Sequence, residues 1–184
     1  MDFTELVEAF ETHTGVAGEI DDAELAIWFN EAQLDLALDF GRIKTVELVP
    51  DENGLVTPPE DNIRVIDVDG DLRNVGGDFR WNSIGQLIVD TTAPVRVSYR
   101  ALPDAAHIFT GADPTQTPDL PLALHHLLAI YAASKYWDRE SEGDTEELNL
   151  ANKWLAQYYA ARKAFLSKMN VPGSSNVDRW VVIE

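Results

Sequence analysis

The chain of 184 residues is 45% hydrophobic and carries 32 acidic against 14 basic residues, a formal charge of −18. A surface of that charge repels nucleic-acid phosphate and anionic membranes at long range, which argues against a function based on passive affinity for either. The chain contains no cysteine, so disulfides, thiolate chemistry and cysteine-based zinc sites are excluded.

The length predicts one domain over residues 1–184. The acidic start, Met1–Glu5, differs from the basic start of a secretory leader, and no apolar run approaches the roughly 20 residues of a membrane span. We therefore expect neither a leader nor contact with a membrane.

The charge is unevenly distributed along the chain. Residues 1–145 hold 28 acidic and 9 basic residues, whereas residues 146–184 hold 4 acidic and 5 basic ones. This asymmetry predicts that the last helix and the tail lie against the acidic remainder, in the same molecule or in a neighbour. A chance fluctuation of composition is the alternative.

Two helices are predicted in residues 1–41. Asp2 and Glu5 have the spacing of a capping box, and the helix they begin should end near Gly15. Asp21 and Glu24 have the same spacing and begin a second helix, which should run to Phe40. Its predicted inward residues are Leu25, Trp28, Phe29, Ala32, Leu36 and Phe40.

The region 44–102 has the alternation and turn residues of β-strands. Val46–Val49 and Leu55–Thr57 flank Asp51–Gly54, whose Asn-Gly pair accepts positive φ, so a hairpin is predicted there. Further strands are predicted at 63–68, 79–81, 86–89 and 95–99. In the last strand the alternation predicts one buried face, formed by Val95, Val97 and Tyr99.

Residues 119–170 are predicted to form two antiparallel helices after a long loop at 103–118. The first helix begins at Pro121 and is apolar nearly all round, so it should be buried in a core or between subunits. Its candidate inter-subunit residues are Leu124, Leu128, Tyr131, Tyr136 and Trp137. The second helix has its N-cap at Asp144 or Thr145. Its predicted apolar stripe comprises Leu148, Ala151, Leu155, Tyr158, Arg162, Phe165 and Met169.

Together these elements predict an α+β fold. An antiparallel bundle of about four helices, from residues 1–41 and 119–170, would carry a small antiparallel β subdomain inserted at 44–102. The segment 171–184 would form an extended C-terminal arm, in which Arg179, Trp180, Val181, Val182 and Ile183 are β-prone. Such an arm can add a strand to the sheet edge of a partner, or fold back on its own β subdomain.

Few residues carry a signal for chemistry. Asp67, Asp69 and Asp71 alternate as in a calcium loop, but Gly70 and the later positions do not match an EF-hand, and a Gly-centred turn explains them better. His125 and His126 are adjacent, so on a helix they diverge by about 100° and cannot chelate one metal. We predict no metal site, no cofactor and no enzymatic activity.

The order of several loose motifs resembles the head-to-tail connector adaptors of tailed bacteriophages, also called neck or tubular-tail adaptors. The resemblance spans about residues 24–165. Its motifs are Val56-Thr-Pro-Pro-Glu-Asp61, then Val95-Arg-Val-Ser-Tyr99 with Leu102-Pro103, then Leu120-Pro121 opening the helix through Ala129-Ile-Tyr-Ala-Ala-Ser-Lys-Tyr136.

The resemblance implies a virion structural protein of the neck, present in the bacterial host cytoplasm before assembly. It implies a ring, usually of about twelve copies, that binds the portal protein and a downstream tail or nozzle protein and extends the DNA channel. Acidic walls would let DNA pass without specific binding.

Two other classes stay open from the sequence. An acidic DNA mimic that inhibits a host nucleic-acid-binding protein would be a monomer or dimer with carboxylates spaced like phosphates. A metal-dependent hydrolase would use Asp67, Asp69 and Asp71 to bind a divalent cation.

Overall fold

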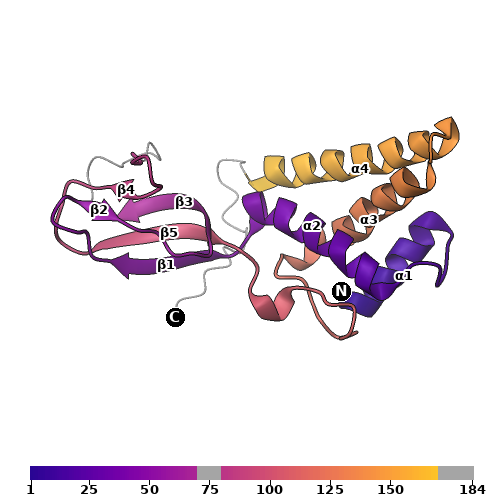
Figure 1. Cartoon of the computed structure of the whole chain (residues 1–184), viewed down its shortest axis with the longest axis horizontal. Coiled ribbons are helices and arrows are strands. Elements are labelled where there is room, and N and C mark those ends of the chain that lie inside the picture. Colours follow the sequence, from indigo (N-terminus) through magenta and orange to yellow (C-terminus); the bar gives the residue numbers. More distant parts are fainter. Residues whose placement is uncertain (70–79, 170–184) are drawn as a thin grey trace. The chain divides into compact units, whose positions relative to one another are not determined.

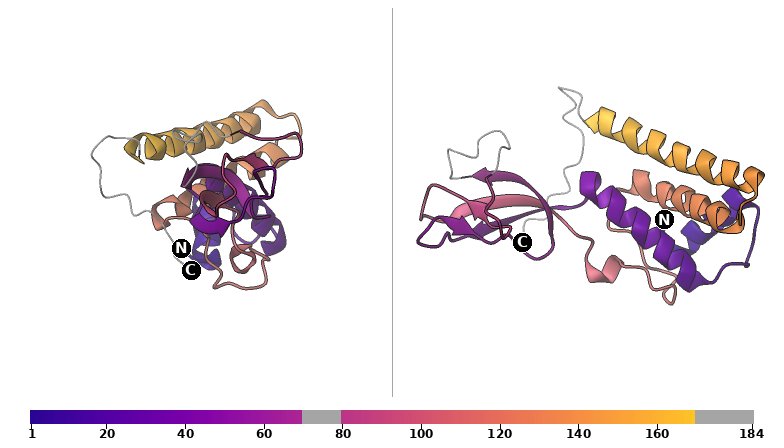
Figure 2. Two further views of the ribbon diagram at one scale, coloured as in Figure 1. Left: turned by 90° about the vertical axis from the view of Figure 1, so that its left-hand side faces the viewer. Right: turned by 45° about the horizontal axis from the view of Figure 1, so that its top comes forward.

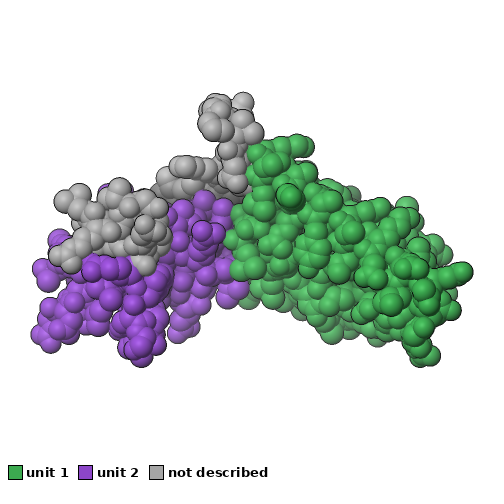
Figure 3. Space-filling model, turned by 90° about the horizontal axis from the view of Figure 1, so that it is seen from above, with its two compact units in different colours: residues 1–40, 103–178 green, residues 41–102, 179–184 purple. Residues whose placement is uncertain are grey.

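The computed structural model of the chain describes residues 1–69 and 80–169, and it has the predicted α+β fold (Figure 1). The chain divides into two compact units, coloured separately in Figure 3. Within the described residues, the helical unit comprises 1–40 and 103–169, and the β unit comprises 41–69 and 80–102. The β unit is therefore an insertion between two parts of the helical unit. The predicted arm, 171–184, lies outside the described residues.

The first two helices have acidic N-caps, as predicted. Helix α1 spans Phe3–Thr14, and its capping box is complete: Asp2 accepts from the Glu5 N–H and Glu5 accepts from the Asp2 N–H. Helix α2 spans Asp22–Phe40, and the Asp21 carboxylate accepts from the N–H of Ala23. These acidic side chains stabilise the helix starts because they oppose the positive end of the helix dipole.

The second pair of helices forms the predicted hairpin. A 3₁₀ turn at Leu122–Leu124 leads into α3, His125–Glu140, and α4 spans Thr145–Met169. The Asp144 carboxylate accepts from the N–H of Glu146, so Asp144 is the N-cap of α4. Helix α3 packs against α1, α2 and α4. It is therefore the central helix of the unit (Figure 2).

The core of the helical unit is filled mainly by aromatic and leucine side chains. Phe3, Phe29 and Phe109 meet with ring centroids 5.6 to 6.0 Å apart, which brings α1, α2 and the 103–118 loop together. Other buried members are Leu6, Phe10, Leu25, Leu36, Leu124, Leu127, Leu128 and Tyr158. The predicted stripe on α4 is confirmed at Ala151 and Tyr158, which are buried, and is wrong at Leu148, which is 42% exposed near the start of the helix.

The 103–118 loop is held by two amide side chains of α2. Asn30 donates from Nδ2 to the Phe109 carbonyl at 2.8 Å and accepts from the Phe109 N–H at 2.9 Å. Gln33 is fully buried, donates to the His107 carbonyl and accepts from the Asp119 N–H. These bonds fix the loop to α2 and hold Phe109, its one member of the core, in place.

The β unit contains two small antiparallel sheets within the described residues. Three strands, β1 Ile43–Leu48, β5 Val95–Ala101 and β3 Asn62–Asp69, pair in the order β1-β5-β3. The short strands β2, Leu55–Val56, and β4, Leu87–Ile88, pair with each other. Val95, Val97 and Tyr99 are buried in a second core, which confirms the predicted inward face of β5.

Two predictions for the β unit are wrong. The turn at Asp51–Gly54 forms, but β1 pairs with β5 and β2 pairs with β4, so the two flanking strands do not form a hairpin. The central strand β5 offers a partner six residues long, whereas β2 offers only two. The predicted strand at 79–81 is reduced to an isolated bridge between Trp81 and Leu87 in the described residues.

The close packing of the 103–118 loop on α2 can be tested by a substitution at Gly111. A Cβ at Gly111 would lie 2.7 Å from the Asp22 carbonyl carbon and 2.8 Å from the Ala23 nitrogen, whereas a Cβ at Gly15 meets nothing within 4 Å. Both glycines have φ of 75°. Gly111→Ala should therefore destabilise the helical unit by about 2 kcal/mol more than Gly15→Ala. Urea denaturation followed by circular dichroism at 222 nm measures both. Equal losses would contradict the packing described.

Candidate interaction surfaces

Helix α2 presents a row of carboxylates to the basic residues of α3 and α4. Glu24 pairs with Arg139 at 2.8 Å, and Glu31 pairs with Lys135 at 2.9 Å. The Tyr131 hydroxyl also donates to Glu31. Because these positions are spaced by seven, four and four residues, Glu24, Glu31, Asp35 and Asp39 lie along one flank of α2.

The most enclosed part of this row joins α2 to α4. Arg162 donates from Nη1 to Asp35 at 2.6 Å, and from Nε and Nη2 to Asp39 at 2.9 and 2.7 Å. The Tyr158 hydroxyl donates to Asp35 at 2.6 Å. Burial and this carboxylate raise the pKa of Tyr158, so its hydroxyl stays protonated and keeps donating. The pairing fulfils, within one molecule, the predicted attraction between the last helix and the acidic remainder.

A second flank of α2 leaves large aliphatic side chains in solvent. Ile27, Leu34 and Leu38 are 58%, 42% and 45% exposed, and their spacing of seven and four residues puts them on one stripe. This α2 stripe lies between the carboxylate row and the loop-binding residues Asn30 and Gln33. Large aliphatic side chains exposed on one side of a helix are candidates for an interaction surface.

The outer face of α4 has a different character. Its exposed residues include Lys153, Ala156, Tyr159, Ala160 and Lys163, and Lys168 extends the basic side toward the end of the helix. Within the part of the chain that the structure describes, no carboxylate forms an ion pair with these three lysines. We call these six residues the α4 face.

Acidic and basic residues are segregated between segment 1–41 and the part of α4 that follows its first turn. Residues 1–41 contain eleven Asp or Glu and no Lys or Arg, whereas residues 148–169 contain four Lys or Arg and no Asp or Glu. Arg162 is the one cation of α4 that the internal pairing uses. The three lysines therefore leave the α4 face positive on an otherwise acidic protein.

The predicted inter-subunit residues of α3 lie inside the helical unit. Leu124, Leu128 and Tyr136 are buried, and Tyr131 and Trp137 are half-buried and pack on the core. The central position of α3 explains its apolar surface without a neighbouring subunit, so these residues do not enter the interface proposed below. The sequence pattern predicts only an inward face for α2, so it does not predict the α2 stripe. Its signal in the sequence is the spacing of Ile27, Leu34 and Leu38 opposite that face.

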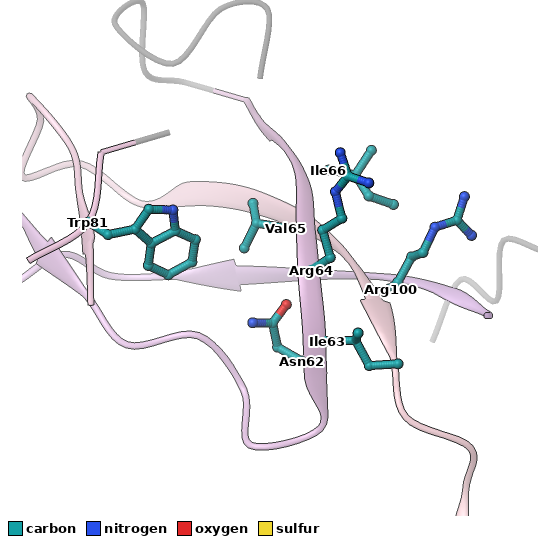
Figure 4. A pocket seen from close by; sticks show the side chains of 7 residues that line it. All are labelled: Asn62, Ile63, Arg64, Val65, Ile66, Trp81 and Arg100. Carbon is teal, nitrogen blue, oxygen red and sulfur yellow. The ribbon is translucent and has the colours of Figure 1, made fainter. Parts of the chain in front are cut away.

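The β unit has a shallow hollow of about 490 Å³ along strand β3 (Figure 4). Arg64 and Arg100 are register partners on β3 and β5, and Trp81, which is 42% exposed, lines the opposite side of the hollow (Figure 4). A hollow with arginines on one side and an exposed indole on the other suits a carboxylate-bearing extended peptide. The remaining lining residues are Asn62, Ile63, Val65 and Ile66.

The other candidate residues are dispersed. Asp67 and Asp69 lie on β3, where Asp69 is opposite Arg96, and Asp71 is outside the described residues. Buried His125 hydrogen-bonds the Leu120 carbonyl through Nε2, and burial lowers its pKa, whereas His126 is exposed. Among residues 1–69 and 80–169, no group of three or more His, Asp or Glu could hold a metal ion. Arg179, Trp180, Val181, Val182 and Ile183 are outside the described residues.

Comparisons with known proteins assign no family. No protein-family model matches the chain, and no curated protein matches its sequence. None of the helices in the described part of the chain is both long and apolar enough to cross a membrane.

The hydroxyl of Tyr158 should contribute measurably to the attachment of α4. Tyr158→Phe keeps the buried ring but leaves Asp35 without one donor, so the free energy of unfolding should fall by about 1–2 kcal/mol. The matched control is Tyr159→Phe, because the neighbouring tyrosine is 52% exposed and its change should stay within about 0.5 kcal/mol. Chemical denaturation at pH 7 measures the difference. Equal stability of the two variants would contradict the pairing.

Proposed function

We propose that this protein is a head-to-tail adaptor of a tailed bacteriophage, a structural virion protein of the neck. It docks as a ring under the portal and extends the DNA channel toward the tail. The observation that carries the proposal is the architecture: a helical unit interrupted between α2 and the 103–118 loop by an inserted β unit. The motifs that resemble the adaptor family run through the same segments.

The charge of the chain supports a channel role. Twelve copies, each of formal charge −18, would surround the DNA with like charge. Such a wall keeps DNA from adhering during packaging and ejection, since attraction to phosphate would slow its passage. The segment 1–41, without any Lys or Arg, is the part of the chain best suited to face DNA.

Two further surfaces would contact the neighbouring proteins of the particle. The segment Arg179–Ile183 is the proposed docking arm for the portal, because it is β-prone and can add a strand to another sheet. The β-unit hollow with Arg64, Arg100 and Trp81 is the proposed contact for the tail or nozzle protein. Neither contact requires a cofactor or a catalytic residue.

The segregated carboxylates also support a second candidate, an acidic DNA mimic. The exposed acids of segment 1–41 would then imitate phosphates and occupy a host DNA-binding protein. The mimic would stay a monomer or dimer in the presence of the portal, and the next experiment therefore separates the two functions.

Mixing the protein with the portal ring of the same virus should produce a larger ring. We expect light scattering to give a mass of about twelve adaptor copies added to each portal, and negative-stain images to show an added layer. A protein that ignores the portal and retains its own mass would contradict the adaptor function. It would then be assayed against host DNA-binding proteins.

Removing the proposed arm should weaken docking without unfolding the protein. A variant truncated after Asn176 loses the residues Arg179–Ile183 but keeps all described elements. Its portal binding should fall at least tenfold, while its circular dichroism spectrum stays that of the full chain. Undiminished binding to the portal would exclude the arm from docking.

A further inference from the structure

We propose that copies of this chain assemble head to tail through two different surfaces of the helical unit. The α2 stripe of one copy packs on the α4 face of the next copy. This inference rests on the proposed ring function, and it names the partner of the α2 stripe as a second copy of the chain.

The first step of the argument is the apolar stripe. Ile27, Leu34 and Leu38 are exposed on a helix whose opposite side is buried in the core. Glu31, the member of the carboxylate row that adjoins the stripe, is already paired with Lys135. The stripe can therefore lose its water without breaking a new ion pair, as an interface core requires.

The second step is charge complementarity. The α4 face carries Lys153, Lys163 and Lys168 and belongs to a segment without acidic residues. The α2 stripe belongs to a segment with no basic residues. Four carboxylates of α2 are paired inside the molecule, whereas Asp21 and Asp22 are exposed at its start. Two copies of α2 facing each other would bring like charges together, and so would two copies of α4. Contact between α2 and α4 pairs opposite charges.

The third step is shape. The large side chains of the α2 stripe need a partner surface that lets a helix approach closely. Ala156 and Ala160 are exposed one turn apart on the α4 face, and their short side chains allow a helix to approach closely. Leu34, in the middle of the stripe, is the side chain best placed to pack against these alanines.

The last step is symmetry. Because the α2 stripe and the α4 face are different surfaces, the contact leaves one free surface of each kind on every copy. Repeated contacts of this type close into a ring or continue as a filament, whereas a contact between identical surfaces stops at a dimer. The portal supplies the template that selects the closed ring.

Cysteine cross-linking tests the contact directly, because the chain has no cysteine of its own. On the portal, the double variant Leu34→Cys/Ala160→Cys with a short bismaleimide should give a ladder of covalent oligomers up to the full ring. A mixture of the two single variants should give dimers that contain one copy of each, and neither single variant alone should give dimers. The matched control replaces Leu34→Cys with Leu122→Cys, which is 69% exposed on the same unit and should not cross-link to Ala160→Cys.

Charge reversal provides a second readout. Lys153→Glu/Lys163→Glu and, separately, Leu34→Asp should each reduce the yield of portal-bound rings at least tenfold while the monomer keeps its helical spectrum. Leu122→Asp should leave the yield unchanged. Rings that form normally with both variants, or that fail to cross-link between Leu34→Cys and Ala160→Cys, would overturn the α2–α4 contact but leave the adaptor function standing. If the wild-type chain forms no ring on the portal, the adaptor function fails, and this inference fails with it.

Discussion

The helical unit depends on how one strongly acidic helix is held against the rest of the fold. Helix α2 supplies seven of the twenty buried residues in the core of the described helical unit. Its other residues include several carboxylates, and segment 1–41 contains no Lys or Arg to balance them. Arg162 reaches across from α4 to Asp35 and Asp39, and Tyr158 adds a hydrogen bond to Asp35. Arg139 and Lys135 of α3 neutralise Glu24 and Glu31. Partly buried charges of this kind are stable only when they are paired.

This internal pairing determines which surfaces are left for partners. Helix α3 packs against α1, α2 and α4, so most of its apolar residues are buried in the core or packed against it. The surfaces that stay in solvent include the aliphatic α2 stripe and the positive α4 face. The acidic residues lie mainly on one part of the chain and the lysines of α4 on another. This separation allows the internal ion pairs, and it also allows the proposed contact between the α2 stripe and the α4 face.

Much of the fold could be predicted from local patterns. The caps at Asp2, Asp21 and Asp144 and the alternation in β5 depend on neighbouring residues, and the structure confirms them. The pairing of β1 with β5 could not be predicted, because a turn at 51–54 is compatible with several partners and the strand order is decided by distant residues. The role of α3 was ambiguous for a similar reason: an apolar helix fits either a core or a subunit interface, and only its three neighbours decide. The docking of Phe109 on Asn30 likewise joins residues far apart in the chain.

A cryo-electron microscopy reconstruction of the portal with this protein bound would test the central claim most directly. The account predicts a closed ring under the portal, in which α2 of each copy lies against α4 of its neighbour and the lysines of the α4 face point into that contact. A portal without added density, or a ring whose copies meet through other surfaces while the α2 stripe stays in solvent, would contradict it.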